Sequence, residues 1–192
     1  ADLATGTLEI DHAAITNFRE QYLLQLAQLS NGNSFVTDKM PQNFYFIPLI
    51  CAAFPEAKIV HVQRDPSATC WSNYKHYFKS KGHGYCYNLA DVVTYYNLYF
   101  DLMQLWQTTY SDRVYTLNYE TLTNNQNKET KKLIKHLGLA WEDDCLAPQK
   151  NKRSVRTASR QQVRQKVYKG SSEAWKKYEP YLNGVFDDLP EP

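Results

Sequence analysis

The most constraining feature of the sequence is a short run rich in β-branched residues, 57–63, followed at once by Arg64-Asp65-Pro66. A short apolar run of this kind is typical of a buried strand. Asp65 is a favoured residue for a helix N-cap, and Pro66 suits the first position of a helix. The sequence therefore predicts a buried strand that ends at an arginine, with a helix beginning directly behind it.

This predicted junction of strand and helix is a favourable place for a bound anion. The first turn of a helix presents free N–H groups and the positive end of the helix dipole, and a guanidinium is a forked cation that matches phosphate. Ser72 follows Arg64 by eight positions and His76 follows by twelve, so we expect all three to point toward one bound group. The alternative for Arg64 taken alone is an ordinary surface cation.

Predicted strands and helices alternate along the whole chain, which indicates an α/β fold with a mainly parallel sheet. The helix expected at 11–29 is amphipathic and should pack on the core. The acidic, proline-rich tail 187–192 is expected to fray. The other expected elements are strands at 35–38, 57–63 and 113–119, and helices at 43–54, from 66 onward, at 88–110, at 128–137 and from Ser171, as its cap, to Pro180.

Composition bounds the class of protein only loosely. A chain of 192 residues with 43% hydrophobic and 22% charged residues is predicted to form a single domain over 1–192, and its net charge of +2 excludes no class of partner. No run approaches the roughly twenty apolar residues that cross a bilayer. The four cysteines form no C-x-x-C pair, which favours reduced thiols in a cytoplasmic compartment. The scattered histidines predict no metal site.

The pattern R-D-P-x5-S after a buried strand, preceded one strand earlier by Lys39-Met40-Pro41, resembles the sulfotransferase superfamily. The resemblance covers about 34–182 and is especially close to bacterial sulfotransferases similar to the tyrosylprotein enzymes. It implies a P-loop-like parallel-sheet fold and transfer of a sulfuryl group from 3′-phosphoadenosine 5′-phosphosulfate (PAPS) to an acceptor hydroxyl, without a metal. The acceptor would be a protein tyrosine, a sugar or a small molecule, and adenosine 3′,5′-bisphosphate would leave.

The resemblance also implies roles for individual residues. Arg64 and Ser72 would hold the 3′-phosphate of PAPS, with His76 as a third contact. Lys39 would be catalytic, because an ammonium can stabilise the negative charge on the bridging oxygen of the departing nucleotide. Further nucleotide contacts are implied at Tyr119 and, in a loop that closes over the nucleotide, at Ser159, Gln162, Val163, Tyr168, Lys169 and Gly170. Without the resemblance, Lys39 could be a lysine at a strand end and Tyr119 a core tyrosine.

The sequence departs from the family pattern in two places. Ala174 replaces the basic residue that often precedes the tryptophan of the closing loop, where Lys169 could stand in. Sulfotransferases also hold the 5′-phosphosulfate in a glycine-rich loop of the P-S-G-T-T type, and nothing in 1–192 matches it. We therefore expect these residues to be the C-terminal part of a longer domain and to be inactive alone. The general base is not assigned, and the oligomeric state is not predicted.

Two other classes of function compete with this interpretation. The stretch 150–169 carries eight basic residues and no acid, which could make the chain a polyanion- or RNA-binding protein or an inactive nucleotide-binding module. However, this stretch lacks interleaved aromatic residues before Tyr168, and the total charge is near neutral, so no nucleic-acid partner is expected. A P-loop phosphotransferase would need a Walker-type lysine and Mg²⁺-binding acids, and neither is recognisable.

Overall fold

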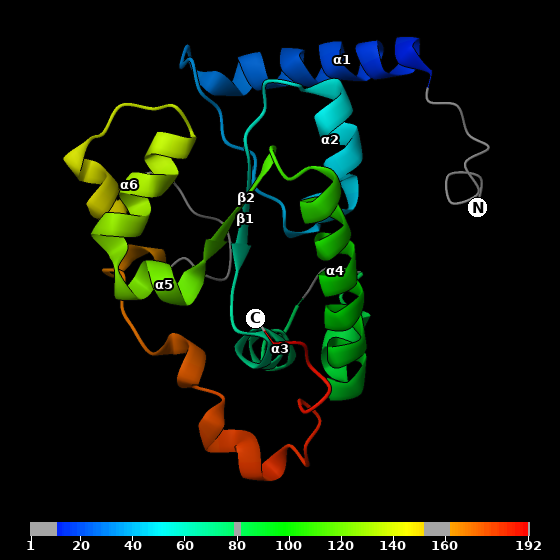
Figure 1. Cartoon of the computed structure of the whole chain (residues 1–192), viewed down its shortest axis with the longest axis vertical. Helices are drawn as coiled ribbons and strands as arrows, with labels where there is room; N and C mark the ends of the chain where they lie inside the picture. Colours follow the sequence, from blue (N-terminus) through cyan, green and yellow to red (C-terminus); the bar gives the residue numbers. More distant parts are fainter. Residues whose placement is uncertain (1–10, 79–81, 152–161, 192) are drawn as a thin grey trace. The chain divides into compact units, whose positions relative to one another are not determined.

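The computed structural model describes residues 11–78, 82–151 and 162–191, and it divides the chain into two compact units, 1–58 and 59–192 (Figure 1). The fold is a helix-rich mixture of α and β structure with a small parallel sheet, compatible with a sulfotransferase fold. Its helices are α1 (His12–Ser30), α2 (Ile47–Ala53), α3 (Pro66–Tyr74), α4 (Leu89–Thr109), α5 (Tyr119–Asn124) and α6 (Gln126–His136), and its strands are β1 (Ile59–Gln63) and β2 (Val114–Asn118).

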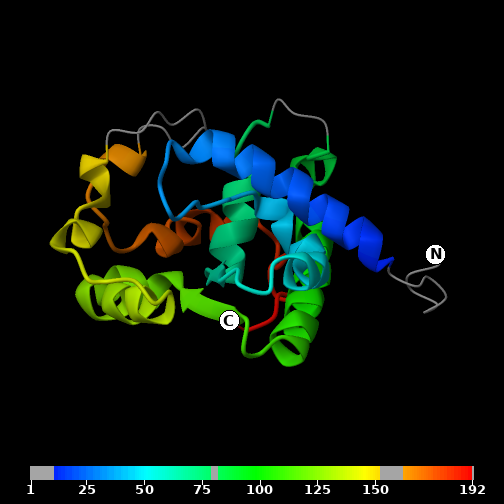
Figure 2. The same ribbon diagram turned by 90° about the horizontal axis from the view of Figure 1, so that it is seen from above.

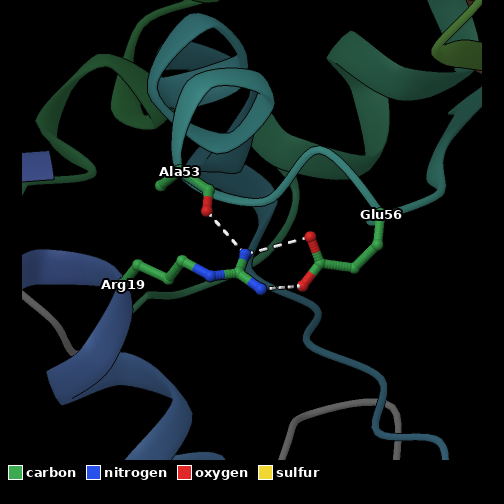
Figure 3. Close-up of polar contacts among 3 residues, drawn as sticks. All are labelled: Arg19, Ala53 and Glu56. Carbon is green, nitrogen blue, oxygen red and sulfur yellow. Dashed lines mark hydrogen bonds and ion pairs between the residues drawn. The ribbon is translucent and has the colours of Figure 1, made fainter. Parts of the chain in front are cut away.

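In the first unit, Arg19 of α1 forms hydrogen bonds at the end of α2 (Figure 3). Arg19 Nη1 donates to the carbonyl oxygen of Ala53 at 2.7 Å, and the guanidinium makes two hydrogen bonds to the carboxylate of Glu56 at 2.6 and 2.9 Å. A cation at this place satisfies a carbonyl that a helix end leaves without an intrahelical partner. The carboxylate raises the pKa of Arg19 through hydrogen bonding. The contact therefore sets how α1 lies along α2.

The expected helix at 11–29 is confirmed as α1, and it packs through aromatic residues on Phe54, which is buried. No residue of α1 is buried. Phe18 and Tyr22 contact the ring of Phe54, with centroid distances of 5.9 and 5.0 Å, while Leu24 and Leu29 are 59% and 72% exposed. The apolar residues of α1 therefore occupy more than one face, and only the face with the aromatic residues is used within this unit.

The strand expected at 35–38 does not form. Residues 33–40 take no regular secondary structure, and Phe35 is 72% exposed. A strand exists through the hydrogen bonds of a neighbouring strand, and no described residue pairs with this segment. The helix expected at 43–54 begins instead as a 3₁₀ turn, Pro41–Phe46, which continues into α2.

In the second unit, β1 and β2 pair in parallel and are joined through α3 and α4. The predicted strands at 57–63 and 113–119 are thus confirmed, each with slightly shorter bounds. The register pairs Gln63 with Asn118, the last residue of each strand. Because the strands are parallel and end together, Arg64 and Tyr119 leave the same edge of the sheet side by side.

The core of the second unit lies between α3, α4 and the C-terminal segment. Cys70 and Val92 are almost fully buried and belong to one cluster with Leu182 and Phe186. In both views the C-terminal segment, drawn in red, runs beside these helices (Figures 1 and 2). The expectation that the tail frays is therefore wrong for its described residues, since Leu189 packs against this cluster.

A polar network on the sheet joins β1 to α4 and β2. His61 Nε2 lies 2.5 Å from the hydroxyl of Tyr99, and its Nδ1 lies 3.4 Å from Gln107 Nε2, which donates to Thr116 at 2.8 Å. Burial lowers the pKa of His61 to about 4 and raises that of Tyr99 to about 12. Neutral His61 thus accepts and donates within the network.

We predict that His61 makes folding sensitive to mild acid. Its folded pKa lies below the ordinary value, so the unfolded chain binds the extra proton first and stability falls as the pH drops from about 6.5 toward 4. Between pH 7 and pH 5, the free energy of unfolding should fall by about 2 kcal/mol more in the parent than in His61→Gln. Urea unfolding of both proteins at the two pH values measures this difference, and equal losses would contradict the prediction.

Candidate anion-binding site

The candidate site lies at the carboxyl ends of the two strands. Arg64 follows β1 directly, and Tyr119 opens α5 directly after β2, with Asn118 as the N-cap that accepts from the Thr121 N–H at 2.8 Å. Arg64 Cζ lies 5.0 Å from the centroid of the Tyr119 ring, within the range of a cation–π contact. The sheet register thus places an aromatic face beneath the guanidinium.

A third segment, from the C-terminal part of the chain, completes the contacts of this arginine. Arg64 Nη2 donates to the carbonyl oxygen of Ser171 at 2.9 Å and lies 3.4 Å from its hydroxyl, and Nε donates to the Ser172 hydroxyl at 3.1 Å. The hydroxyls of Tyr119 and Ser171 lie 2.9 Å apart. We refer to Ser171 and Ser172 as the serine pair. Three segments distant in sequence therefore meet at one half-buried guanidinium.

The carboxylate of Glu120 lies behind the serine pair. Its Oε1 accepts from the Ser172 hydroxyl at 2.5 Å and from the Asp65 N–H at 3.2 Å. Asp65 in turn caps α3, because its side chain accepts from the Ala68 N–H at 2.6 Å. The predicted cap is thus confirmed, and Glu120 connects the start of α3 to the serine pair.

The backbone turns at Gly170, and this turn places the serine pair beside Arg64. The φ of Gly170 is +83°, in the left-handed region that only glycine adopts at little cost. A Cβ added there would meet no atom within 4 Å, so the requirement comes from the backbone conformation alone.

The helix expected to start at a Ser171 cap is not observed. The structure has two 3₁₀ turns, Ser171–Glu173 and Lys176–Tyr181, and Pro180 lies inside the second. The first turn has Gly170 at its N-cap position, and glycine has no side chain to form a capping bond. Ser171 lies inside this turn, and its hydroxyl contacts Arg64 and Tyr119.

Ser72 and His76 were predicted to share a bound group with Arg64, and this stays a prediction. Ser72 lies half-buried in α3, and no hydrogen bond joins it to Arg64 in the described part. The helix ends at Tyr74, so His76 lies beyond the helix that carries Ser72. His76 lies in the following turn, with its ring edge-on to Phe78 at a centroid distance of 4.8 Å.

Lys39 belongs to the first unit and is exposed. It follows Asp38, which accepts a 2.5 Å hydrogen bond from the hydroxyl of Tyr22 on α1. Burial and this hydrogen bond raise the pKa of Tyr22 to about 12. A hydrogen bond thus joins the residue before Lys39 to α1. The catalytic role of Lys39 stays a prediction.

The residues predicted in the closing loop are described only in part. Ser159 lies outside the described residues, and Gln162 opens the short 3₁₀ turn Gln162–Arg164. Val163, Tyr168 and Lys169 are exposed. Their contacts with a nucleotide stay predictions.

Sequence reasoning did not single out Glu120 or the serine pair as site residues. Glu120 carried a usable signal, because it directly follows the strand predicted at 113–119, and the strand predicted beside it ends at Arg64. The serine pair directly follows Gly170, a predicted nucleotide contact, but no local pattern links it to Arg64, which lies 107 and 108 positions earlier.

Comparison with known proteins shows the family. The sulfotransferase family model matches residues 4–143. An uncharacterised protein of Aquifex aeolicus (strain VF5) is 33% identical over 186 residues, which is 96% of this chain and 24% of the relative. The omega-hydroxy-beta-dihydromenaquinone-9 sulfotransferases of Mycobacterium bovis and Mycobacterium tuberculosis are each 30% identical over 117 residues, 57% of this chain and 30% of the relative.

The chain therefore belongs to the sulfotransferase family. It spans about a quarter of the Aquifex relative, and its match covers under a third of the mycobacterial ones. Within the described residues, no three His, Cys, Asp or Glu side chains gather as a metal ion would require. The same residues include no helix with the length and apolar character to span a membrane.

We predict that the turn at Gly170 is sensitive to a side chain. Gly170→Ala should lower the free energy of unfolding by about 1–2 kcal/mol, because alanine resists a positive φ. Gly84→Ala is the matched control: an added Cβ there also meets nothing within 4 Å, and Gly84 has no positive φ. Chemical unfolding should show little change for the control. Equal stability of the two variants would count against the role given to Gly170.

Proposed function

We propose that the protein is a PAPS-dependent sulfotransferase and that Arg64 binds the 3′-phosphate of the nucleotide. The observation that carries the proposal is the place of Arg64, a half-buried guanidinium at the carboxyl ends of two parallel strands and next to the start of α3. Ligands of open α/β sheets bind outside the carboxyl ends of the strands, and a guanidinium matches the geometry of a phosphate. The family assignment supplies the reaction type.

In the proposed reaction, the acceptor hydroxyl attacks the sulfur of PAPS in line with the departing nucleotide. A bond forms between the acceptor oxygen and sulfur, and the bond between sulfur and the bridging phosphate oxygen breaks. The hydroxyl proton passes to a general base that we do not assign. Positioning and fixed positive charge carry the catalysis, and we assign to Lys39 the role of stabilising the charge that develops on the bridging oxygen.

The relatives support a small-molecule alcohol as the acceptor. The two mycobacterial enzymes are named for an omega-hydroxylated menaquinone derivative, which carries its hydroxyl on a lipid. We therefore place a long-chain alcohol ahead of a protein tyrosine and a sugar. The competing polyanion-binding interpretation uses eight basic residues of 150–169, four of which lie at 152–161, outside the described residues, and it stays a prediction.

Arg64→Ala should weaken binding of adenosine 3′,5′-bisphosphate by roughly ten- to a hundredfold, because it removes a charge-assisted contact with phosphate. The matched control is Arg113→Ala, which removes a guanidinium at the opposite, amino-terminal end of the same strands. Isothermal titration calorimetry of the full-length protein and both variants gives the dissociation constants. Binding by the Arg64 variant within twofold of the parent would refute the proposed phosphate contact.

Lys39→Ala should lower kcat by about a hundredfold or more and leave the affinity for adenosine 3′,5′-bisphosphate within threefold, because the ammonium acts on charge formed in the transition state. Lys58→Ala removes another exposed lysine of the same unit and is the control. Turnover of PAPS is measured with a phenol, a sugar and a long-chain alcohol, and the best acceptor is then used for the variants. A kcat within threefold of the parent would exclude Lys39 from catalysis.

A further inference from the structure

We infer that Glu120 is a positioning residue that acts through Ser172 to orient Arg64, and so determines how strongly the protein prefers nucleotides that carry a 3′-phosphate. This inference rests on the proposed function and extends it to a residue that does not itself touch the nucleotide. It depends on which hydrogens of the guanidinium are in use and on which way the Ser172 hydroxyl points.

The serine pair occupies one edge of the Arg64 guanidinium. Nε donates to Ser172 and Nη2 to Ser171, and these two nitrogens form the side edge of the fork. The ring of Tyr119 lies against the guanidinium, with Cζ 5.0 Å from its centroid. One edge of the guanidinium is therefore occupied by the serine pair, and one face by the Tyr119 ring. The hydrogens of Nη1 have no partner among the described residues, so Nη1 is the nitrogen left to meet an anion.

Glu120 decides the polarity of the Ser172 hydroxyl. A hydroxyl has one hydrogen to donate, and Ser172 gives it to Glu120 Oε1 over 2.5 Å. Its lone pairs then face Arg64 Nε, which donates to it at 3.1 Å. A hydrogen bond to a carboxylate is stronger than one between neutral groups, and Ser172 is only 7% exposed, so water does not readily replace the carboxylate.

The same carboxylate oxygen also fixes the backbone next to Arg64. Glu120 Oε1 accepts from the N–H of Asp65 at 3.2 Å, so it holds the residue that follows the arginine. Arg64 is thus held twice from one oxygen, through its side chain by way of Ser172 and through its main chain by way of Asp65. Loss of Glu120 would free both the hydroxyl and the peptide, and the guanidinium would no longer be pre-oriented for a phosphate.

The test compares two nucleotides that differ only in the 3′-phosphate. Dissociation constants for adenosine 3′,5′-bisphosphate and adenosine 5′-monophosphate are measured by calorimetry on the full-length protein and on Glu120→Ala, Glu120→Gln and Ser172→Ala. The dissociation constant of the monophosphate divided by that of the bisphosphate measures the preference for a 3′-phosphate. This ratio isolates the contact with the 3′-phosphate, because the adenosine and the 5′-phosphate are common to both ligands. If the hydrogen bonds of Glu120 only stabilised the fold, their loss would weaken the binding of both nucleotides together and leave the ratio unchanged.

We expect Glu120→Ala and Ser172→Ala to lower this ratio by about tenfold, with the monophosphate affinity within threefold of the parent. Glu120→Gln should retain most of the ratio, because its carbonyl oxygen can accept both hydrogen bonds. The control is Glu173→Ala, a carboxylate beside the serine pair that forms an ion pair with Lys176 and makes no contact with Arg64. It should leave the ratio unchanged.

Unchanged ratios in Glu120→Ala and Ser172→Ala would overturn the inference. If Glu120→Ala does not fold by circular dichroism, Ser172→Ala alone decides, because it removes the hydroxyl and keeps the carboxylate bond to Asp65. A parent protein that binds both nucleotides equally would instead overturn the proposed 3′-phosphate site, and with it this inference. The two failures are distinguishable, because the second is seen in the parent before any substitution is made.

Discussion

The described part of the site depends on the hydrogen-bond and aromatic partners that surround the Arg64 guanidinium. A half-buried cation requires hydrogen-bond partners, since burying unpaired charge is costly. Parallel pairing of β1 with β2 supplies the Tyr119 ring, and the C-terminal segment supplies the serine pair. These contacts hold the fork in one orientation before any ligand arrives, which lowers the cost of binding an anion there.

The segment that carries the serine pair is anchored by the core of the second unit. Gly170 turns the chain toward Arg64, and beyond the serine pair Leu182 and Phe186 are buried with Val92 of α4. Burial of these side chains is worth on the order of 1.5–3 kcal/mol each, about as much as one hydrogen bond to a charged group at the site. The apolar cluster therefore stabilises the backbone, and the polar contacts fix its detailed orientation.

The family match covers only part of the site. The family model covers residues 4–143, which include Lys39, Arg64 and Tyr119. The serine pair lies beyond the match, and its place at the site comes from hydrogen bonds. The tail shows a related point: its composition predicted fraying, yet Leu189, its one large apolar residue, packs on the core. The composition of a short segment does not predict this contact, because the cluster that receives Leu189 is formed by residues distant in sequence.

By itself, the sequence determined the strand that ends at Arg64, the Asp65 cap behind it, the parallel pair of strands and the family. These features follow from local rules of propensity and capping and from one motif with fixed spacing. Only the tertiary structure decided that 35–38 is no strand, that His76 lies beyond its helix, and that Glu120 and the serine pair surround the arginine. The strand is absent because no described residue pairs with it, and the site contacts join residues more than fifty positions apart, which no local pattern specifies.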